Sequence, residues 1–101
     1  MPDYSQLDES LRALNDPTRR RVVELLGAGA QRAGELATSA GVTPPVMSRH
    51  LRVLLAAGLV DDERSVTDAR VRLFFLCREP LTVVGSWIER VLSEAPWEDD
   101  S

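Results

Sequence analysis

Residues 33–60 read AGELATSAGVTPPVMSRHLRVLLAAGLV, and this stretch predicts two helices joined by a tight turn. The first helix, expected over residues 33–40, is short and rich in small residues, and Gly41 stands where a glycine commonly ends a helix. Thr43 is a natural N-cap for the second helix because its hydroxyl can accept a hydrogen bond from a backbone N–H of the first turn. Two prolines follow in that turn, where a missing N–H costs little. The stretch therefore predicts a helix-turn-helix over residues 33–57.

The second of these helices has one apolar and one polar face. Its apolar residues recur at helical spacing: Met47, Leu51, Leu54 and Leu55, with Leu59 just past the helix end. An apolar back and a short polar front after a tight turn are typical of a recognition helix, whose first residues enter the major groove of DNA. The residues expected to contact DNA from this helix are Thr43, Pro44, Val46, Ser48, Arg49 and Arg52.

Three residues of this helix have competing interpretations. Arg49 and Arg52 are the strongest candidates for a functional role, because a solvated surface pair is the only competing one. His50 abuts the apolar face, so a packed or backbone-bonded histidine is favoured over a DNA contact, and a metal ligand is remote.

The charges of the 101-residue chain are unevenly distributed. The net charge is −4, but residues 1–16 carry −3, residues 17–72 carry +3 and residues 73–101 carry −4. A basic centre between acidic ends is expected if the centre faces phosphate. All basic residues are arginine, whose planar fork suits phosphate and guanine edges. A compositional bias of the genome explains the absence of lysine equally well.

Two helices are expected before the helix-turn-helix. Apolar residues at three- and four-residue spacing predict an amphipathic helix over residues 4–15. A second helix begins at Pro17, with Asp16 as its N-cap, and glycines at 27 and 29 end it. Three consecutive arginines span most of one turn of this helix, and they are either a solvated face or, ahead of a helix-turn-helix, phosphate contacts. The candidates among them are Arg19 and Arg20.

A β-hairpin is expected over residues 60–77. An extended segment, Asp61 to Arg64, leads through a polar loop into a strong strand, residues 70–77. Cys77 falls on the strand face of Val71 and Phe75, which favours a small buried hydrophobe over a redox switch. The hairpin's candidate contacts to the DNA backbone are Arg64, Arg70 and Arg72.

A last amphipathic helix is expected over residues 80–95, opened by Pro80 and stopped by Pro96, with an acidic tail over residues 96–101. The first and last helices together carry more apolar surface than a small core can cover, so their pairing between two copies of the chain is the economical solution. For Trp87 the alternative is a ligand pocket. The expected dimer interface comprises Leu7, Leu11, Leu81, Val84, Trp87, Ile88 and Val91.

The predicted order is helix, helix, helix-turn-helix, hairpin, helix. We therefore expect a mainly α fold with a β-hairpin wing (α+β): one winged helix-turn-helix domain over residues 1–101, with an extra helix at each end.

The segments LRALNDPTRRRVVELL, GELA, SRHLRVLLAAGLV and RVRLFFL resemble the ArsR family of bacterial winged-helix repressors over roughly residues 7–95. The resemblance implies a homodimer, held by the first and last helices, that binds a palindromic operator and represses transcription until a signal releases it. It also implies that the tip of the second helix of the helix-turn-helix enters the major groove while the hairpin touches the flanking DNA.

The chain departs from the family pattern in three places. The paired cysteines and histidine clusters of the family's metal sensors are missing, and one Cys and one His cannot assemble such a site, so we expect no metal and no cofactor. Thr43-Pro44-Pro45 stands where the family commonly has Ser-Gln-Pro, which removes a bidentate adenine reader. The hairpin carries acidic residues beside its arginines, which weakens the case for a strong wing contact: Asp61, Asp62, Glu63 and Asp68.

Several other classes of protein are disfavoured. The apolar runs are too short for a membrane span and the acidic first residues are unlike a signal peptide, so a cytoplasmic location is the default expectation. No catalytic constellation is present, so we expect no enzyme. Two alternatives stay open: a winged helix that serves protein–protein association without DNA, and a DNA binder gated by a small-molecule inducer or an oxidant.

Overall fold

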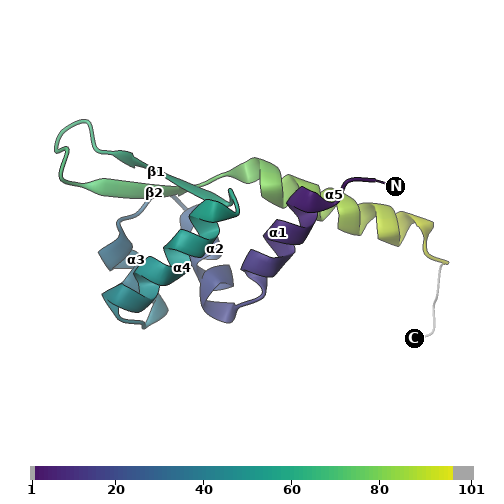
Figure 1. Ribbon diagram of the computed structural model, residues 1–101, viewed down its shortest axis with the longest axis horizontal. Helices are drawn as coiled ribbons and strands as arrows, with labels where there is room; N and C mark the ends of the chain where they lie inside the picture. Colours follow the sequence, from purple (N-terminus) through teal and green to yellow (C-terminus); the bar gives the residue numbers. More distant parts are fainter. Residues whose placement is uncertain (1, 97–101) are drawn as a thin grey trace.

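The computed structural model describes residues 2–96 and has the predicted order of elements (Figure 1). A small helical body carries a two-stranded antiparallel hairpin on one side, and the last helix leaves the body at the opposite end. The seven elements are α1 (Ser5–Leu14), α2 (Pro17–Gly27), α3 (Ala33–Ala40), α4 (Pro44–Ala56), β1 (Val60–Arg64), β2 (Arg72–Leu76) and α5 (Arg78–Glu94).

The core lies between α2, α3, α4 and the base of the hairpin. Its central side chains are completely shielded from solvent: Val22, Leu36, Met47, Leu54 and Leu59 are each 0% exposed. These residues come from four different segments, so the helix-turn-helix and its neighbours form one continuous apolar interior. This interior is what fixes the orientation of α4.

The caps expected from the sequence are present. The Asp16 carboxylate accepts a hydrogen bond from the Arg19 backbone N–H at 3.0 Å, and the Thr43 hydroxyl accepts one from the Val46 N–H at a longer 3.4 Å. Gly41 has φ +72°, the left-handed conformation that glycine adopts without strain. The turn between α3 and α4 is therefore defined on both sides by local chemistry.

The hairpin is anchored to the body through β2. Phe74 is 2% exposed, and its backbone N–H and C=O exchange hydrogen bonds of 2.8 and 3.0 Å with Gln31, in the segment before α3. In the register of the hairpin Asp62 lies opposite Phe74 and Arg64 opposite Arg72. The buried face of the strand is therefore the one that also carries Arg72, which turns this arginine toward the body.

Two details near the end of the hairpin differ from expectation. β2 is shorter than the predicted strand, and Cys77 lies at the N-cap position of α5, where it is only partly buried. The expectation that Cys77 is buried by strand alternation is therefore wrong, because Cys77 follows the strand and does not belong to it. Burial together with the charge of Asp61 raises the pKa of the Cys77 thiol. α5 begins at Arg78 rather than Pro80, because a proline within the first helical turn needs no N–H.

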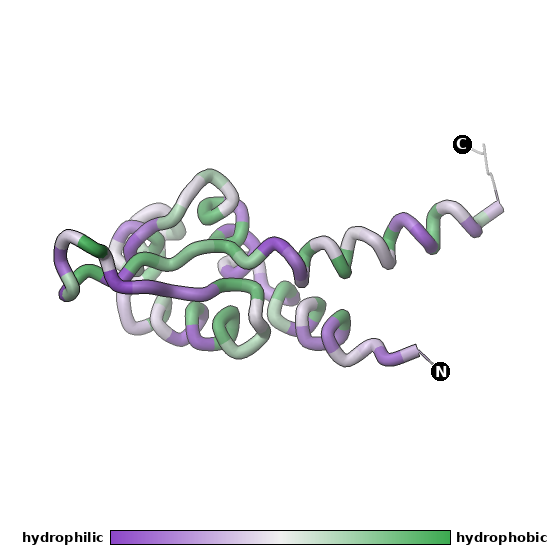
Figure 2. The backbone as a smooth tube through the Cα atoms, turned by 90° about the horizontal axis from the view of Figure 1, so that it is seen from above, coloured by the Kyte–Doolittle hydropathy of each residue, from purple (hydrophilic) through white to green (hydrophobic). Residues whose placement is uncertain are grey.

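The α5 helix is the least covered part of the fold. Pro80 is the only buried residue of this helix. The α1 helix packs along the first half of α5, while the second half extends beyond the body (Figure 2). The Cα radius of gyration, 16.2 Å, exceeds the roughly 13 Å of a compact chain of this length. Of the predicted acidic tail, residues 96–101, only Pro96 lies within the described residues.

Candidate nucleic-acid interface

The α4 helix presents its polar side to solvent and buries its apolar side. Met47, Leu51 and Leu54 are at most 2% exposed, whereas Arg49 and Arg52, on other sides of the helix, are exposed. This separation follows from the 3.6-residue period. Of the other predicted contacts, Val46 is half-buried and three are exposed at the start of the helix: Thr43, Pro44 and Ser48.

The two α4 arginines are uncommitted within residues 2–96, where neither makes a side-chain hydrogen bond or an ion pair. A guanidinium without an internal partner keeps all five donors for an external acceptor. Position, exposure and free donors together make Arg49 and Arg52 the centre of the candidate interface.

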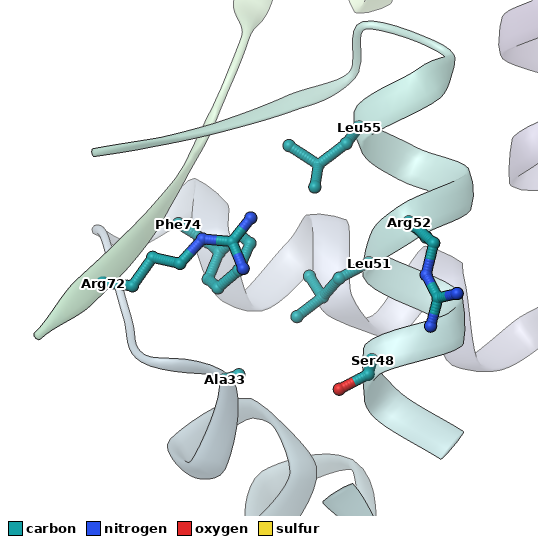
Figure 3. Close-up of a pocket in the computed structure, with 7 residues that line it drawn as sticks. All are labelled: Ala33, Ser48, Leu51, Arg52, Leu55, Arg72 and Phe74. Atoms are coloured by element: carbon teal, nitrogen blue, oxygen red, sulfur yellow. The ribbon is translucent and has the colours of Figure 1, made fainter. Parts of the chain in front are cut away.

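A cavity of about 340 Å³ separates α4 from the hairpin (Figure 3). One wall belongs to β2, where the guanidinium of Arg72 points toward α4 and lies over the ring of Phe74, with 4.8 Å between the Arg72 Cζ and the ring centroid. Its remaining lining comes from Ala33 at the start of α3 and from Ser48, Leu51, Arg52 and Leu55 on α4. The cavity thus has an apolar floor, a hydroxyl and two arginines, and no acidic side chain lines it.

All three predicted hairpin arginines have internal partners. The Arg70 guanidinium donates to both carboxylate oxygens of Asp68 at 3.1 and 3.2 Å, and this contact lowers the pKa of that carboxyl. Arg64 donates to the Ala69 carbonyl at 3.3 Å, and Arg72 forms an ion pair with Asp62. These arginines are exposed, but the acidic residues noted in the sequence neutralise two of them locally.

Arg19 is used within the fold, which argues against its predicted role as a phosphate contact. Its side chain is 16% exposed, its Nε donates to the Ala13 carbonyl, and its Nη1 lies 3.3 Å from Nδ1 of His50. Because a guanidinium only donates, Nδ1 of His50 is the acceptor in that contact. Arg20 stays exposed and donates to the Leu14 carbonyl at 2.9 Å. Helical periodicity carries no signal for the Arg19–His50 contact, which joins residues 31 positions apart.

His50 is accordingly a structural residue, as expected, although its partner is a side chain rather than the backbone. It ties α4 to the junction of α1 and α2, and so holds the back of α4 against the rest of the body. Among residues 2–96, no three His, Cys, Asp or Glu side chains cluster in a way that could hold a metal ion. No helix in the same range is long and apolar enough to cross a membrane.

The predicted dimer residues divide into two sets. Leu7 is 6% exposed at the contact of α1 with α5, so it is buried within one protomer, and Leu81 packs against the core. Leu11, Ile88 and Val91 are exposed at 41, 44 and 47%, and Val84 and Trp87 are half-buried. Two further apolar residues are exposed nearby: Tyr4 at the N-cap of α1 and Leu92 on α5.

Comparison with known proteins places the chain among regulators. Residues 14–63 match the family described as a helix-turn-helix domain. The chain is 43% identical over 67 residues to the HTH-type transcriptional regulator Rv2034 of Mycobacterium tuberculosis, and 34% identical over 58 residues to the transcriptional repressor SdpR of Bacillus subtilis. These matches cover 66% and 57% of this chain, and they span only 63% and 64% of the two relatives' own lengths.

The solved structures agree with this placement over a longer stretch. The crystal structure of an ArsR family transcriptional regulator superposes with a TM-score of 0.76 at 31% sequence identity, covering 91% of this chain and all of the other. The resemblance of the sequence to the ArsR family is therefore confirmed, because the two structures superpose over nearly the whole fold. The chain belongs to the ArsR family of transcriptional regulators, a class of regulators rather than of enzymes.

Proposed function

We propose that the chain is a sequence-specific DNA-binding regulator that acts as a homodimer and represses transcription from a palindromic operator. The observation that carries the proposal is the α4 helix, whose residues Met47, Leu51 and Leu54 are buried while Arg49 and Arg52 stand exposed without an internal partner within residues 2–96. A buried back fixes the helix rigidly, and a free polar front can reach into the major groove.

In this proposal the contacts divide by chemistry. Arg49 and Arg52 are suited to guanine edges or nearby phosphates, and Ser48 to either base edges or phosphate. Thr43 and Pro44, at the exposed N-terminal end of α4, approach the groove first, with Val46 beside them. The hairpin and Arg20 supply backbone contacts, which position the protein without carrying sequence information.

The homodimer is supported by the apolar residues left exposed on α1 and α5. A cyclic dimer would bury the same surface on both copies, so that Leu11, Ile88 and Val91 each meet a partner residue. Two α4 helices related by a two-fold axis require a palindromic operator, since each reads one half-site. Such a regulator acts where the chromosome lies, in the cytoplasm.

The first test is binding to a duplex from the upstream region of the gene, compared with a scrambled duplex at about 0.15 M salt. Specific operator recognition predicts a preference of at least about 10³-fold. If Arg52 reads a base, the variant Arg52→Ala should lose roughly 1–3 kcal/mol of binding free energy and discriminate less between the two duplexes. Arg21→Ala is the matched control, because it removes the same charge from α2, where Arg21 pairs with Glu24 at 3.4 Å.

The outcomes separate the competing functions. Unchanged affinity of the Arg52→Ala protein removes that residue from the interface. Equal binding to both duplexes points to an operator elsewhere or to a required effector molecule. Absence of binding to either duplex, even at low salt, contradicts the proposal and favours a module for protein–protein association.

A further inference from the structure

The cavity between α4 and β2 is a concave site whose cationic groups come from two different elements. Arg72 enters it from the hairpin, and Ser48 and Arg52 line it from α4 (Figure 3). Ser48 turns its hydroxyl toward the space, and the Arg52 guanidinium runs along the helix toward Ser48. Two guanidinium groups and a hydroxyl are the donors that commonly bind a phosphate group.

The arginine on the hairpin side is held in place. Arg72 stacks on Phe74, whose ring is buried, and its Nε donates to the Asp62 carboxylate. The Arg72 and Asp62 side chains are 48% and 26% exposed, so solvent and ligand can reach both. Arg64 lies directly opposite Arg72 in the register, and Asp62 therefore also offsets the repulsion between two like charges.

We propose that this cavity is the site of one phosphate group, supplied by the DNA backbone in the complex, and that Asp62, which pairs with the Arg72 Nε without lining the cavity, competes with that phosphate for the Arg72 guanidinium in the free protein. This inference rests on the proposed function and adds a built-in competitor to it. A carboxylate and a phosphate offer a guanidinium the same kind of acceptor, so binding DNA exchanges Asp62 for phosphate on Arg72. Asp62 thereby lowers the affinity for every DNA sequence alike.

The decisive comparison uses two neighbouring acids of β1. Asp62→Asn and Glu63→Gln each remove one negative charge, but successive strand side chains point to opposite faces, and only Asp62 pairs with Arg72. On a scrambled duplex, Asp62→Asn should bind roughly two- to five-fold more tightly than Glu63→Gln, the effect of releasing one partly exposed ion pair. Equal gains in the two variants would overturn the proposal, since a general change of net charge would then explain both.

Arg72 must be required for that gain. Arg72→Gln should weaken binding about five-fold at 0.15 M salt and lower the slope of log K against log[salt] by about 0.9, the loss of one phosphate contact. In the Arg72→Gln background, Asp62→Asn should give no gain beyond that of Glu63→Gln. A persisting gain would contradict the exchange.

Two controls accompany these variants. Thermal unfolding of each variant checks that the hairpin is retained. The DNA affinity of Arg72→Lys, which keeps the charge but loses the planar guanidinium, should fall between those of wild type and Arg72→Gln.

A second measurement needs no DNA and so separates this inference from the proposed function. Inorganic phosphate is titrated into the 15N-labelled protein against chloride at equal ionic strength, and the arginine Nε–H signals are followed. The signals of Arg72 and Arg52 should shift more than that of Arg90 on α5, and Asp62→Asn should enlarge the Arg72 shift. Uniform shifts of all arginines would refute the site even if the protein binds DNA. Selective shifts in a protein that binds no DNA would refute the proposed function and assign the cavity to free phosphate.

Discussion

The α4 and α5 helices carry the same kind of apolar stripe and meet opposite environments. On α4 the stripe residues Met47, Leu51 and Leu54 are at most 2% exposed, whereas on α5 Ile88 and Leu92 are exposed at 44 and 69%. α4 contacts α2, α3 and β1, while α5 has α1 along its first half (Figure 1). The comparison teaches that an amphipathic pattern predicts a buried face but does not say which molecule covers it.

The two stripes should therefore respond differently to substitution. A change on α4 acts on the free energy of unfolding of the domain, because the contacts it removes lie within one chain. A change on the outer half of α5 acts on association, because the surface it alters becomes buried only against a second copy in the proposed dimer. Four variants test and refine this division.

The largest effect is expected for Leu54→Ala on α4. Truncating a side chain that is 0% exposed leaves a cavity in the core and should cost about 2–5 kcal/mol of unfolding free energy. Urea denaturation at fixed protein concentration measures the loss. Val53→Ala, one position along and 40% exposed, should stay within about 0.5 kcal/mol. Similar losses in both variants would mean that α4 is not held as its burial indicates.

The α5 counterpart is Val91→Glu. A carboxylate from each protomer placed in an apolar interface should weaken dimerisation by about 2–3 kcal/mol, roughly 30- to 150-fold, while helical content by circular dichroism stays unchanged. Sedimentation equilibrium gives the dissociation constant. Ser93→Glu adds the same charge on the opposite side of the helix and should leave association intact. A Val91→Glu protein that associates normally would place the dimer contact elsewhere.

A smaller effect is expected for Arg19→Ala, at the junction between the two ends of the molecule. The substitution leaves the Ala13 carbonyl and Nδ1 of His50 without their donor, which should cost about 1–3 kcal/mol of unfolding free energy. Arg20→Ala removes an arginine of the same turn whose hydrogen bond to the Leu14 carbonyl is exposed to solvent, and it should cost less than about 0.5 kcal/mol. If the two variants unfold alike in urea, the Arg19 contacts contribute little to stability.

The smallest effect concerns pH and the N-cap of α2. The hydrogen bond from the Arg19 backbone N–H lowers the pKa of the Asp16 carboxyl below its ordinary value of 3.8. A carboxyl whose pKa is lower in the folded state stabilises the fold above its unfolded pKa and loses that contribution as pH falls through the folded pKa. The unfolding free energy of the wild-type protein should exceed that of Asp16→Asn by up to about 1 kcal/mol at pH 7, and the difference should shrink as the pH falls below 3.8. A constant difference across that range would contradict the assignment.

Local signals explain which parts of the fold were predictable. Asp16, Gly41 and Thr43 act on their immediate neighbours along the chain, so the starts and ends of the central helices follow from residue type and spacing. The exposure of Arg49 and Arg52 follows from the same helical period.

Contacts between distant segments were not predictable. Arg19 meets His50 only because the α1–α2 junction packs against α4, and Arg72 meets Asp62 only through the register of the hairpin. In both cases an arginine that resembles a free phosphate contact in the sequence has an internal acceptor in the folded chain. Neither partner could be assigned without the tertiary arrangement.

The elongated shape of the chain affects how the proposed dimer could move on DNA. The long axis of the described protein measures 53 Å, and the outer half of α5 and the α4 helix lie toward opposite ends of it (Figure 1), so a dimer joined at α5 holds its joint away from the DNA-facing helix. In such a dimer a rotation between the protomers moves each α4 farther than it moves the residues of the joint, because α4 lies farther from the axis of rotation. Any molecule that repacks the joint by a few degrees could thus disengage both helices at once without touching either of them.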